Sequence, residues 1–125
     1  MVDVPTENSD FPAKVLIMLR HPQQLGNAEE ALRMAKHMQK IRSLPTTLAL
    51  WGPEGVLMGK KNTFLEYSDR IRELVQLGVS IVVCHLGMER MGIIVSELKE
   101  GLNAVPAERI PELLLLHYKD LIIYF

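Results

Sequence analysis

The sequence predicts an α/β domain in which helices cover a mostly parallel sheet of four to five strands. Three observations lead to this fold class. Short apolar segments rich in β-branched residues alternate along the chain with amphipathic segments of helical period. Helix-capping and helix-stop signals separate these segments. The chain has 125 residues, of which 48% are hydrophobic, so it is long enough to bury one substantial core but too short for two domains of ordinary size.

We expect residues 1–12 to form a flexible leader and residues 13–125 to form a single domain. The leader is polar, contains two prolines and has no apolar periodicity. The continuous apolar run within 14–20 is typical of a strand that is covered on both faces, as in a parallel sheet. An asparagine form of the capping box at Asn27, followed by an apolar stripe, then predicts a helix over about 27–42.

The middle of the chain predicts a second strand, a second helix and a third strand. The second strand covers 46–51, and the glycine- and proline-containing segment 52–55 breaks it. A capping box of the usual T-x-x-E form starts at Thr63 and predicts a helix. Gly78 occupies the position typical of the glycine that follows a helix. The β-branched segment 79–84 is then the third strand.

The last third of the chain predicts shorter elements. We expect a short helix beginning near Gly87 and a helical stretch over 95–100. The segment 101–106 is either a loop or a short strand. Pro111 suits the first position of a helix, and the apolar segment 120–125 is the closing strand.

Composition excludes several classes of protein. The formal net charge of −1 gives no basic excess, so we expect no nucleic-acid partner. A single cysteine rules out an intramolecular disulfide and a multi-cysteine metal site. The polar, acidic N-terminus does not resemble a signal peptide, and the longest apolar-rich run, 79–88, is too short to span a bilayer. These features indicate a cytoplasmic protein without a membrane span, and we expect no cofactor and no metal.

The candidate chemistry lies where the strands end. Right-handed crossovers place the carboxyl ends of all parallel strands on one edge of the sheet, where ligands bind. Cys84 ends the third predicted strand and precedes a helix start, a position that favours an anion. A thiolate there is both a nucleophile and a sulfur acceptor. The alternative is that Cys84 is a small hydrophobic residue that completes a core strand. Both interpretations are open on position alone.

The stretch GVSIVVCHLGMERMGI, residues 78–93, resembles the DsrE/DsrF-like (YchN-like) sulfur-relay family. The shared pattern is a glycine–valine opening, a strand that ends in cysteine, and a later glycine followed by an apolar residue. In this chain the matching residues are Gly78, Val79, Cys84, Gly92 and Ile93. The segments GNAEEALRMAKHM, WGPEGVLMGKK and KDLIIYF are also similar to parts of the family, so the resemblance covers residues 14–125.

The resemblance implies a flavodoxin-like three-layer sandwich that assembles as a homo-trimer, a homo-hexamer or with related subunits. It also implies a function: the matching cysteine, Cys84, accepts sulfur as a persulfide and passes it on, in the manner of a sulfurtransferase or sulfur carrier. Some family members carry a second cysteine three residues later. Gly87 stands there in this chain, which excludes a CxxC pair, so separate sulfur donor and acceptor proteins are required.

Histidines and arginines near the strand ends are the remaining site candidates. In the 2-1-3 strand order of flavodoxin-like sheets the first and third strands are neighbours, and His21 would then lie close enough to Cys84 to stabilise its thiolate or move a proton. The alternative for His21 is a loop residue that caps a backbone carbonyl. His85 would reach the site only if the chain turns after Cys84. Arg20 and Arg90 are either partners of the thiolate or solvated charges.

Two other functions are open. The chain is alternatively a non-catalytic assembly subunit or interaction module of the same fold, because some family members lack the cysteine. A flavin- or nucleotide-binding role is weaker, since the segment after the first strand has no hydroxyl-rich phosphate loop. The glycine- and lysine-containing segment 52–61 does not match the GxxxxGK[ST] phosphate loop, and the sequence leaves open whether it contacts a ligand.

Overall fold

The computed structural model describes residues 14–117 and 119–125, so the expected leader over 1–12 lies outside the described residues. The strands in this part of the chain are β1 (Val15–Leu19), β2 (Thr46–Leu50), β3 (Ser80–Cys84), β4 (Asn103–Val105) and β5 (Leu121–Tyr124). The α-helices are α1 (Asn27–Lys36), α2 (Gly52–Leu57), α3 (Ser68–Gln76), α4 (His85–Arg90) and α5 (Arg109–Leu116). The shorter helical turns are η1 (His37–Ile41), η2 (Leu65–Tyr67) and η3 (Val95–Glu97).

The expected strands are confirmed, each within one or two residues of its predicted ends. The segment 101–106, left open as a loop or a strand, contains the short strand β4. The helix expected over 27–42 is confirmed as α1 followed by the π-helical turn η1. The helix expected near Gly87 already begins at His85, and the stretch 95–100 forms only the single turn η3.

The capping box predicted at Asn27 is wrong. Gly26 precedes the helix in the left-handed conformation, with φ of 80°, and no side chain caps the helix start. The Asn27 side chain instead donates a hydrogen bond of 3.0 Å to the carbonyl of His21. Only glycine enters this conformation without steric cost, so backbone geometry rather than a side chain sets the beginning of α1.

The capping box predicted at Thr63 is also wrong, because the helix begins five residues later, at Ser68. The Thr63 hydroxyl donates to the carbonyls of Leu57 and Lys60 and so closes the turn that follows α2. A threonine hydroxyl satisfies carbonyls of a preceding turn as readily as it caps a following helix. The sequence pattern does not distinguish these two uses.

The segment 52–55 follows the end of strand β2, as predicted, and it forms the beginning of helix α2. Trp51 has an extended backbone, Gly52 has φ of 74°, and Pro53 lies in the first turn, where its missing N–H costs nothing. Glycine and proline therefore start this helix directly after the strand ends.

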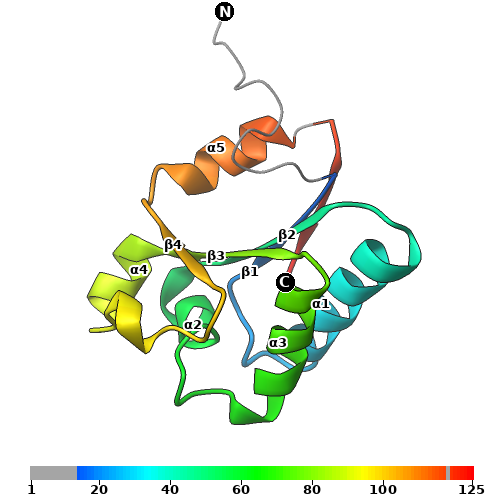
Figure 1. Ribbon diagram of the computed structural model, residues 1–125. Coiled ribbons are helices and arrows are strands. Elements are labelled where there is room, and N and C mark those ends of the chain that lie inside the picture. The colour runs from blue at the N-terminus through cyan, green and yellow to red at the C-terminus, as the bar shows by residue number, and fades with distance from the viewer. Residues whose placement is uncertain (1–13, 118) are drawn as a thin grey trace, which may run out of the picture.

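All strand pairs are parallel, and the strand order is β4-β3-β2-β1-β5. The sheet confirms the α/β fold, but the 2-1-3 order is wrong because β2 lies between β1 and β3. From β1 to β4 the chain crosses the sheet in one direction, and it returns in the opposite direction to add β5. Right-handed crossovers therefore place α1 and α3 on one face and α5 on the other, as Figure 1 shows.

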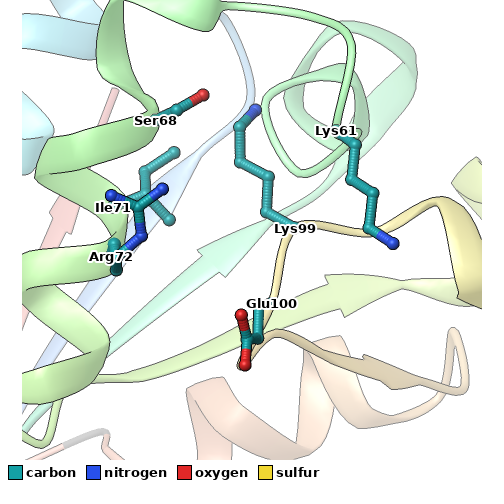
Figure 2. Close-up of a pocket in the computed structure, with 6 residues that line it drawn as sticks. All are labelled: Lys61, Ser68, Ile71, Arg72, Lys99 and Glu100. Atoms are coloured by element: carbon teal, nitrogen blue, oxygen red, sulfur yellow. The ribbon is translucent and has the colours of Figure 1, made fainter.

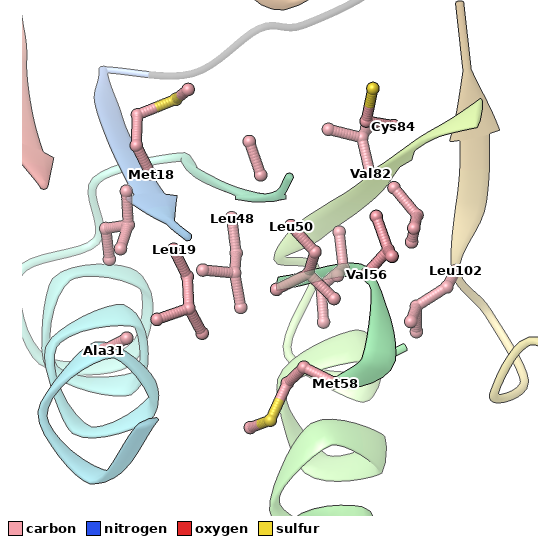
Figure 3. Packing of buried hydrophobic residues seen from close by; sticks show 14 of the residues in the cluster. Met18, Leu19, Ala31, Leu48, Leu50, Val56, Met58, Val82, Cys84 and Leu102 are labelled. Atoms are coloured by element: carbon pink, nitrogen blue, oxygen red, sulfur yellow. The ribbon is translucent and has the colours of Figure 1, made fainter. Parts of the chain in front are cut away.

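The core occupies both faces of the central strands. All residues of β1 and β2 are buried, as expected for parallel strands covered on both sides. Figure 3 shows Leu19, Leu48 and Leu50 pointing toward α1 and α3, whereas Met18 and Cys84 point to the opposite side. Because side chains alternate along a strand, this register sends Cys84 to the face that carries α5.

His117, at the end of α5, is fully buried, with its Nδ1 3.3 Å from Oδ2 of Asp120. Burial lowers the pKa of His117 below its ordinary value of 6.5, and the Asp120 carboxylate opposes part of this shift. The unfolded chain therefore takes up the proton first as pH falls. We expect the free energy of unfolding to decrease as pH drops below 6.5 toward the lowered pKa of the folded state.

Chemical denaturation at several pH values between neutral and mildly acidic checks this prediction. The His117→Gln variant should lose the part of the pH dependence that comes from this ring. Replacement of the exposed His37 by glutamine is the control and should leave the wild-type profile in place. An identical pH profile in His117→Gln and wild type would contradict the prediction.

Candidate functional site

The carboxyl edge of the sheet has a switch point between β3 and β4. The connection after β3 enters α4, which lies beside α2, and the connection after β4 leads to α5 on the opposite face. In α/β sheets ligands bind where adjacent connections diverge in this way, because the divergence opens a crevice. Cys84 is the last residue of β3 and is in register with Val105 at the end of β4, so it stands at this crevice.

A pocket of about 330 Å³ lies at the crevice, and Cys84 is part of its wall. The Cys84 residue is 8% exposed, so its sulfur is recessed in the surface. The other walls come from the ends of β1 and β2, from α4 and from the beginning of α5, and include Arg20, Trp51, Gly87, Arg90 and Ile110. Four separate segments of the chain therefore build one concave site around one thiol.

Arg20 is held in place by its neighbours. Its guanidinium carbon lies 4.9 Å from the centroid of the Trp51 ring, within the range of a cation–π contact. Its side chain also crosses Gly52, where an added Cβ would come within 2.8 Å of the Arg20 Cγ. Gly52 is thus required both for its positive φ and for the space that Arg20 occupies.

The two arginines of the pocket have no carboxylate partner among the described residues, and no described acidic residue lines the pocket. Other arginines are paired within a helix or between helices: Arg33 with Glu30, Arg70 with Glu29, Arg72 with Asp69, and Arg109 with Glu112. Arg20 and Arg90 therefore make the mouth of the Cys84 pocket electropositive, which favours anions.

Gly87 occupies the position where a CxxC pair would have its second cysteine. A Cβ at Gly87 would lie 2.8 Å from Cγ1 of Val56, so the glycine lets α4 pack closely against α2. A cysteine three residues after Cys84 would not fit without a shift of the Val56 side chain or of one of these helices. Close packing of α4 against α2 thus disfavours a CxxC pair at this site.

The structure does not bring His21 or His85 into the pocket. His21 follows β1, and β2 separates that strand from β3. Its carbonyl accepts from Asn27 and from the N–H of Gln24, so it closes a turn. The His85 ring is about half exposed, and its Nδ1 lies 3.5 Å from Oε1 of Glu89 on the outer side of α4. Neither histidine lines the pocket that Cys84 lines.

Sequence reasoning placed Trp51 at the ligand-binding edge without giving it a role, and it missed the beginning of α5 as a part of this site. Trp51 directly follows β2, and its position at the carboxyl end of a strand was a usable signal. Ile110 is 26 positions after Cys84 in the sequence, and no local pattern connects the two residues. Their meeting depends on the return of the chain across the sheet after β4.

A second pocket, of about 160 Å³, lies between α3 and the segment before β4, as Figure 2 shows. Its three cationic side chains already have hydrogen-bond or ion-pair partners within the chain. The buried Lys99 ammonium donates to the carbonyls of Met58, Lys60 and Thr63 at 2.7 to 2.8 Å. Lys61 donates to the carbonyl of Ser96, and Arg72 pairs with Asp69. The lysines thus anchor the segment 52–61 and its continuation to the rest of the domain.

The described residues contain no cluster of histidine, cysteine and acidic side chains suited to a metal ion. Within the same residues, none of the helices is both long and apolar enough to cross a membrane. No family model and no curated protein matches the sequence. The comparison with solved structures, in contrast, gives matches over nearly the whole chain.

The YchN protein from E. coli matches with a TM-score of 0.73 at 17% identity, over 90% of this chain and 99% of that one. The fold is YchN-like. A protein of unknown function from Bacteroides thetaiotaomicron has a TM-score of 0.71 at 18% identity, over 94% of this chain and 100% of its own. Another, from Methanobacterium thermoautotrophicum, has a TM-score of 0.67 at 16% identity, over 89% of this chain and 97% of its own. At these identities the likeness concerns the fold.

Proposed function

We propose that this protein is a small sulfur carrier that accepts sulfur as a persulfide on Cys84 and passes it to a partner. The observation that carries the proposal is the position of Cys84, recessed in a pocket at the switch point and accompanied by two arginines without carboxylate partners among the described residues. A persulfide donor is an anion, so the electropositive mouth formed by Arg20 and Arg90 attracts it toward Cys84. The YchN-like fold and the sequence resemblance of residues 78–93 support the same role.

The single thiol determines what kind of carrier this is. A second cysteine is absent from the whole sequence, so no internal disulfide can release the carried sulfur. A sulfur donor and a sulfur acceptor outside this chain must supply and remove it. We infer that the protein acts in a reducing compartment such as the cytoplasm. We infer an assembly as a homo-trimer, a homo-hexamer or with related subunits from the family resemblance.

Mass spectrometry of the intact protein after incubation with sodium polysulfide tests the proposal. We expect wild type to gain the mass of one sulfur atom and Cys84→Ser to gain none, because this thiol is the only one in the sequence. Treatment with cyanide should then remove the added sulfur as thiocyanate and restore the original mass. Absence of an adduct in folded wild type would contradict the carrier function.

A second candidate function is that of a non-catalytic assembly subunit. Its support is the segment 86–95, next to the pocket, where four apolar side chains are exposed by 38% to 63%: Leu86, Met91, Ile94 and Val95. Exposed apolar side chains gathered in one short segment favour an interaction site. Alkylation by iodoacetamide separates the two functions. A carrier requires modification of Cys84 in the native protein, whereas modification only after unfolding would favour the assembly subunit.

A further inference from the structure

The pocket at Cys84 is larger and more apolar than sulfur transfer alone requires. Its volume of about 330 Å³ lies within the range of sites for small organic molecules. Trp51, Ile110 and Pro111 supply apolar walls, while Arg20 and Arg90 are its charged members. Such a pocket suits a molecule with a hydrocarbon part and an anionic group. A bare inorganic sulfur chain would leave the apolar walls without a partner.

Of the two arginines in the pocket, Arg20 is the one whose side chain is restrained by neighbouring residues before a ligand binds. Because it is stacked on Trp51 and laid across Gly52, its guanidinium has lost rotamer freedom before a ligand arrives. A planar guanidinium binds a carboxylate through two parallel hydrogen bonds. The absence of any acidic residue from the described pocket wall leaves both guanidinium groups available for an anion from outside the chain.

We propose that the pocket binds the carboxylate of a low-molecular-weight thiol, and that the persulfide of such a thiol is the immediate sulfur donor to Cys84. This inference rests on the carrier function proposed above and adds the chemical class of the donor. Arg20 and Arg90 hold the carboxylate, the apolar wall holds the carbon chain, and the sulfur end of the donor reaches the Cys84 sulfur. Small thiols without a negative charge are disfavoured as donors.

The transfer step is balanced without a further reactant. The Cys84 thiolate attacks the terminal sulfur of the donor, R–S–SH, and a new S–S bond forms as the donor S–S bond breaks. The products are the Cys84 persulfide, which keeps the proton on its terminal sulfur, and the thiolate R–S⁻. The Cys84 sulfur is oxidised and the inner sulfur of the donor is reduced by the same amount.

The binding arm of the test uses Cys84→Ser, which cannot react with the probes. Trp51 is the only tryptophan in the sequence and lines the pocket, so its fluorescence reports occupancy. The probes are 3-mercaptopropionate, 2-mercaptoethanol and cysteamine, which are similar in size but negative, neutral and positive. We expect 3-mercaptopropionate to bind at least about tenfold more tightly than the other two, the equivalent of one charge-assisted contact.

Arginine variants in the same background assign the binding to the pocket. Arg20→Gln and Arg90→Gln should each weaken binding of 3-mercaptopropionate by about tenfold. The exposed Arg42, which is outside the pocket, provides the matched control, and Arg42→Gln should leave the affinity unchanged. The inference would be overturned by equal affinity for the three probes or by no binding of 3-mercaptopropionate. It would also be overturned if Arg42→Gln weakened binding of 3-mercaptopropionate as much as the pocket variants do.

The transfer arm uses wild type and the persulfides of the same three thiols. We expect the persulfide of 3-mercaptopropionate to load Cys84 fastest, with the preference reduced in Arg20→Gln. If Cys84 accepts sulfur from polysulfide but shows no preference among the three persulfides, the donor class is wrong and the carrier function stands. If Cys84→Ser binds 3-mercaptopropionate but wild type accepts no sulfur from any donor, the carrier function is wrong and the donor role is overturned with it, while the carboxylate site stands.

Discussion

Gly55→Ala should destabilise the protein by about 2–3 kcal/mol, which corresponds to a decrease in Tm on the order of 10 °C for a domain of this size. Gly55 is buried in α2, and a Cβ there would lie 2.5 Å from the carbonyl oxygen of Leu19. The contacted atom belongs to the backbone of the fully buried strand β1, so it cannot move aside as the end of a flexible side chain can. The helix must shift away from the strand instead.

The effect should extend to the candidate site, because α2 begins at Gly52 and Pro53 in the pocket wall. Thermal unfolding followed by circular dichroism measures the stability, and Trp51 fluorescence reports the pocket. Gly26→Ala is the control: it has a positive φ of 80° but nothing within 4 Å of the added Cβ, so it should cost about 1 kcal/mol. If Gly55→Ala lowers the stability no more than Gly26→Ala does, the contact between α2 and β1 is not rigid.

Lys99→Met should destabilise the protein by about 2–4 kcal/mol, because it removes the ammonium that donates to three buried or partly buried carbonyl groups. The Lys99 ammonium donates to Met58, Lys60 and Thr63, and so joins the turn after α2 to the segment before β4. Methionine keeps the length and apolar stem of lysine, so the loss is assigned to the missing hydrogen bonds rather than to a cavity. Denaturation in urea measures the change.

Lys61→Met is the matched control for this prediction. Lys61 is exposed and makes a single side-chain hydrogen bond, of 2.9 Å, to the carbonyl of Ser96 among the described residues. Its replacement should change the free energy of unfolding by less than about 0.5 kcal/mol. An equal decrease in the free energy of unfolding in Lys99→Met and Lys61→Met would contradict the role assigned to the buried ammonium.

The stability contributed by Lys99 should also depend on pH. Burial lowers the pKa of Lys99 from 10.5 to about 8, and the charge of Glu66 opposes this shift. Between these two values the unfolded chain binds the proton more tightly than the folded chain. The free energy of unfolding of wild type, relative to Lys99→Met, should therefore rise as pH increases from 8 to 10.5 and be constant below 8. A constant difference up to pH 10.5 would show that the carbonyl groups keep the ammonium charged.

Features set by local chemistry were readable from the sequence. The strands follow from apolar, β-branched runs bounded by turn residues, and the amphipathic stripe after Asn27 is enough to predict α1. The position of Cys84 at the end of β3 was readable for the same reason, because the apolar run ends there. The helix starts were harder, since Thr63 has the same local pattern whether it caps a helix or closes a turn.

The amino-acid pattern alone was enough to establish the α/β class, the order of elements along the chain, and the single thiol at a strand end. Packing in three dimensions puts β2 between β1 and β3, which removes His21 from Cys84, and returns α5 to place Ile110 at the same pocket. Packing also lays Arg20 on Trp51 and buries the Lys99 ammonium. The physical reason is range: periodicity and caps act over a few residues, whereas strand order and pocket walls depend on contacts between segments far apart in the chain.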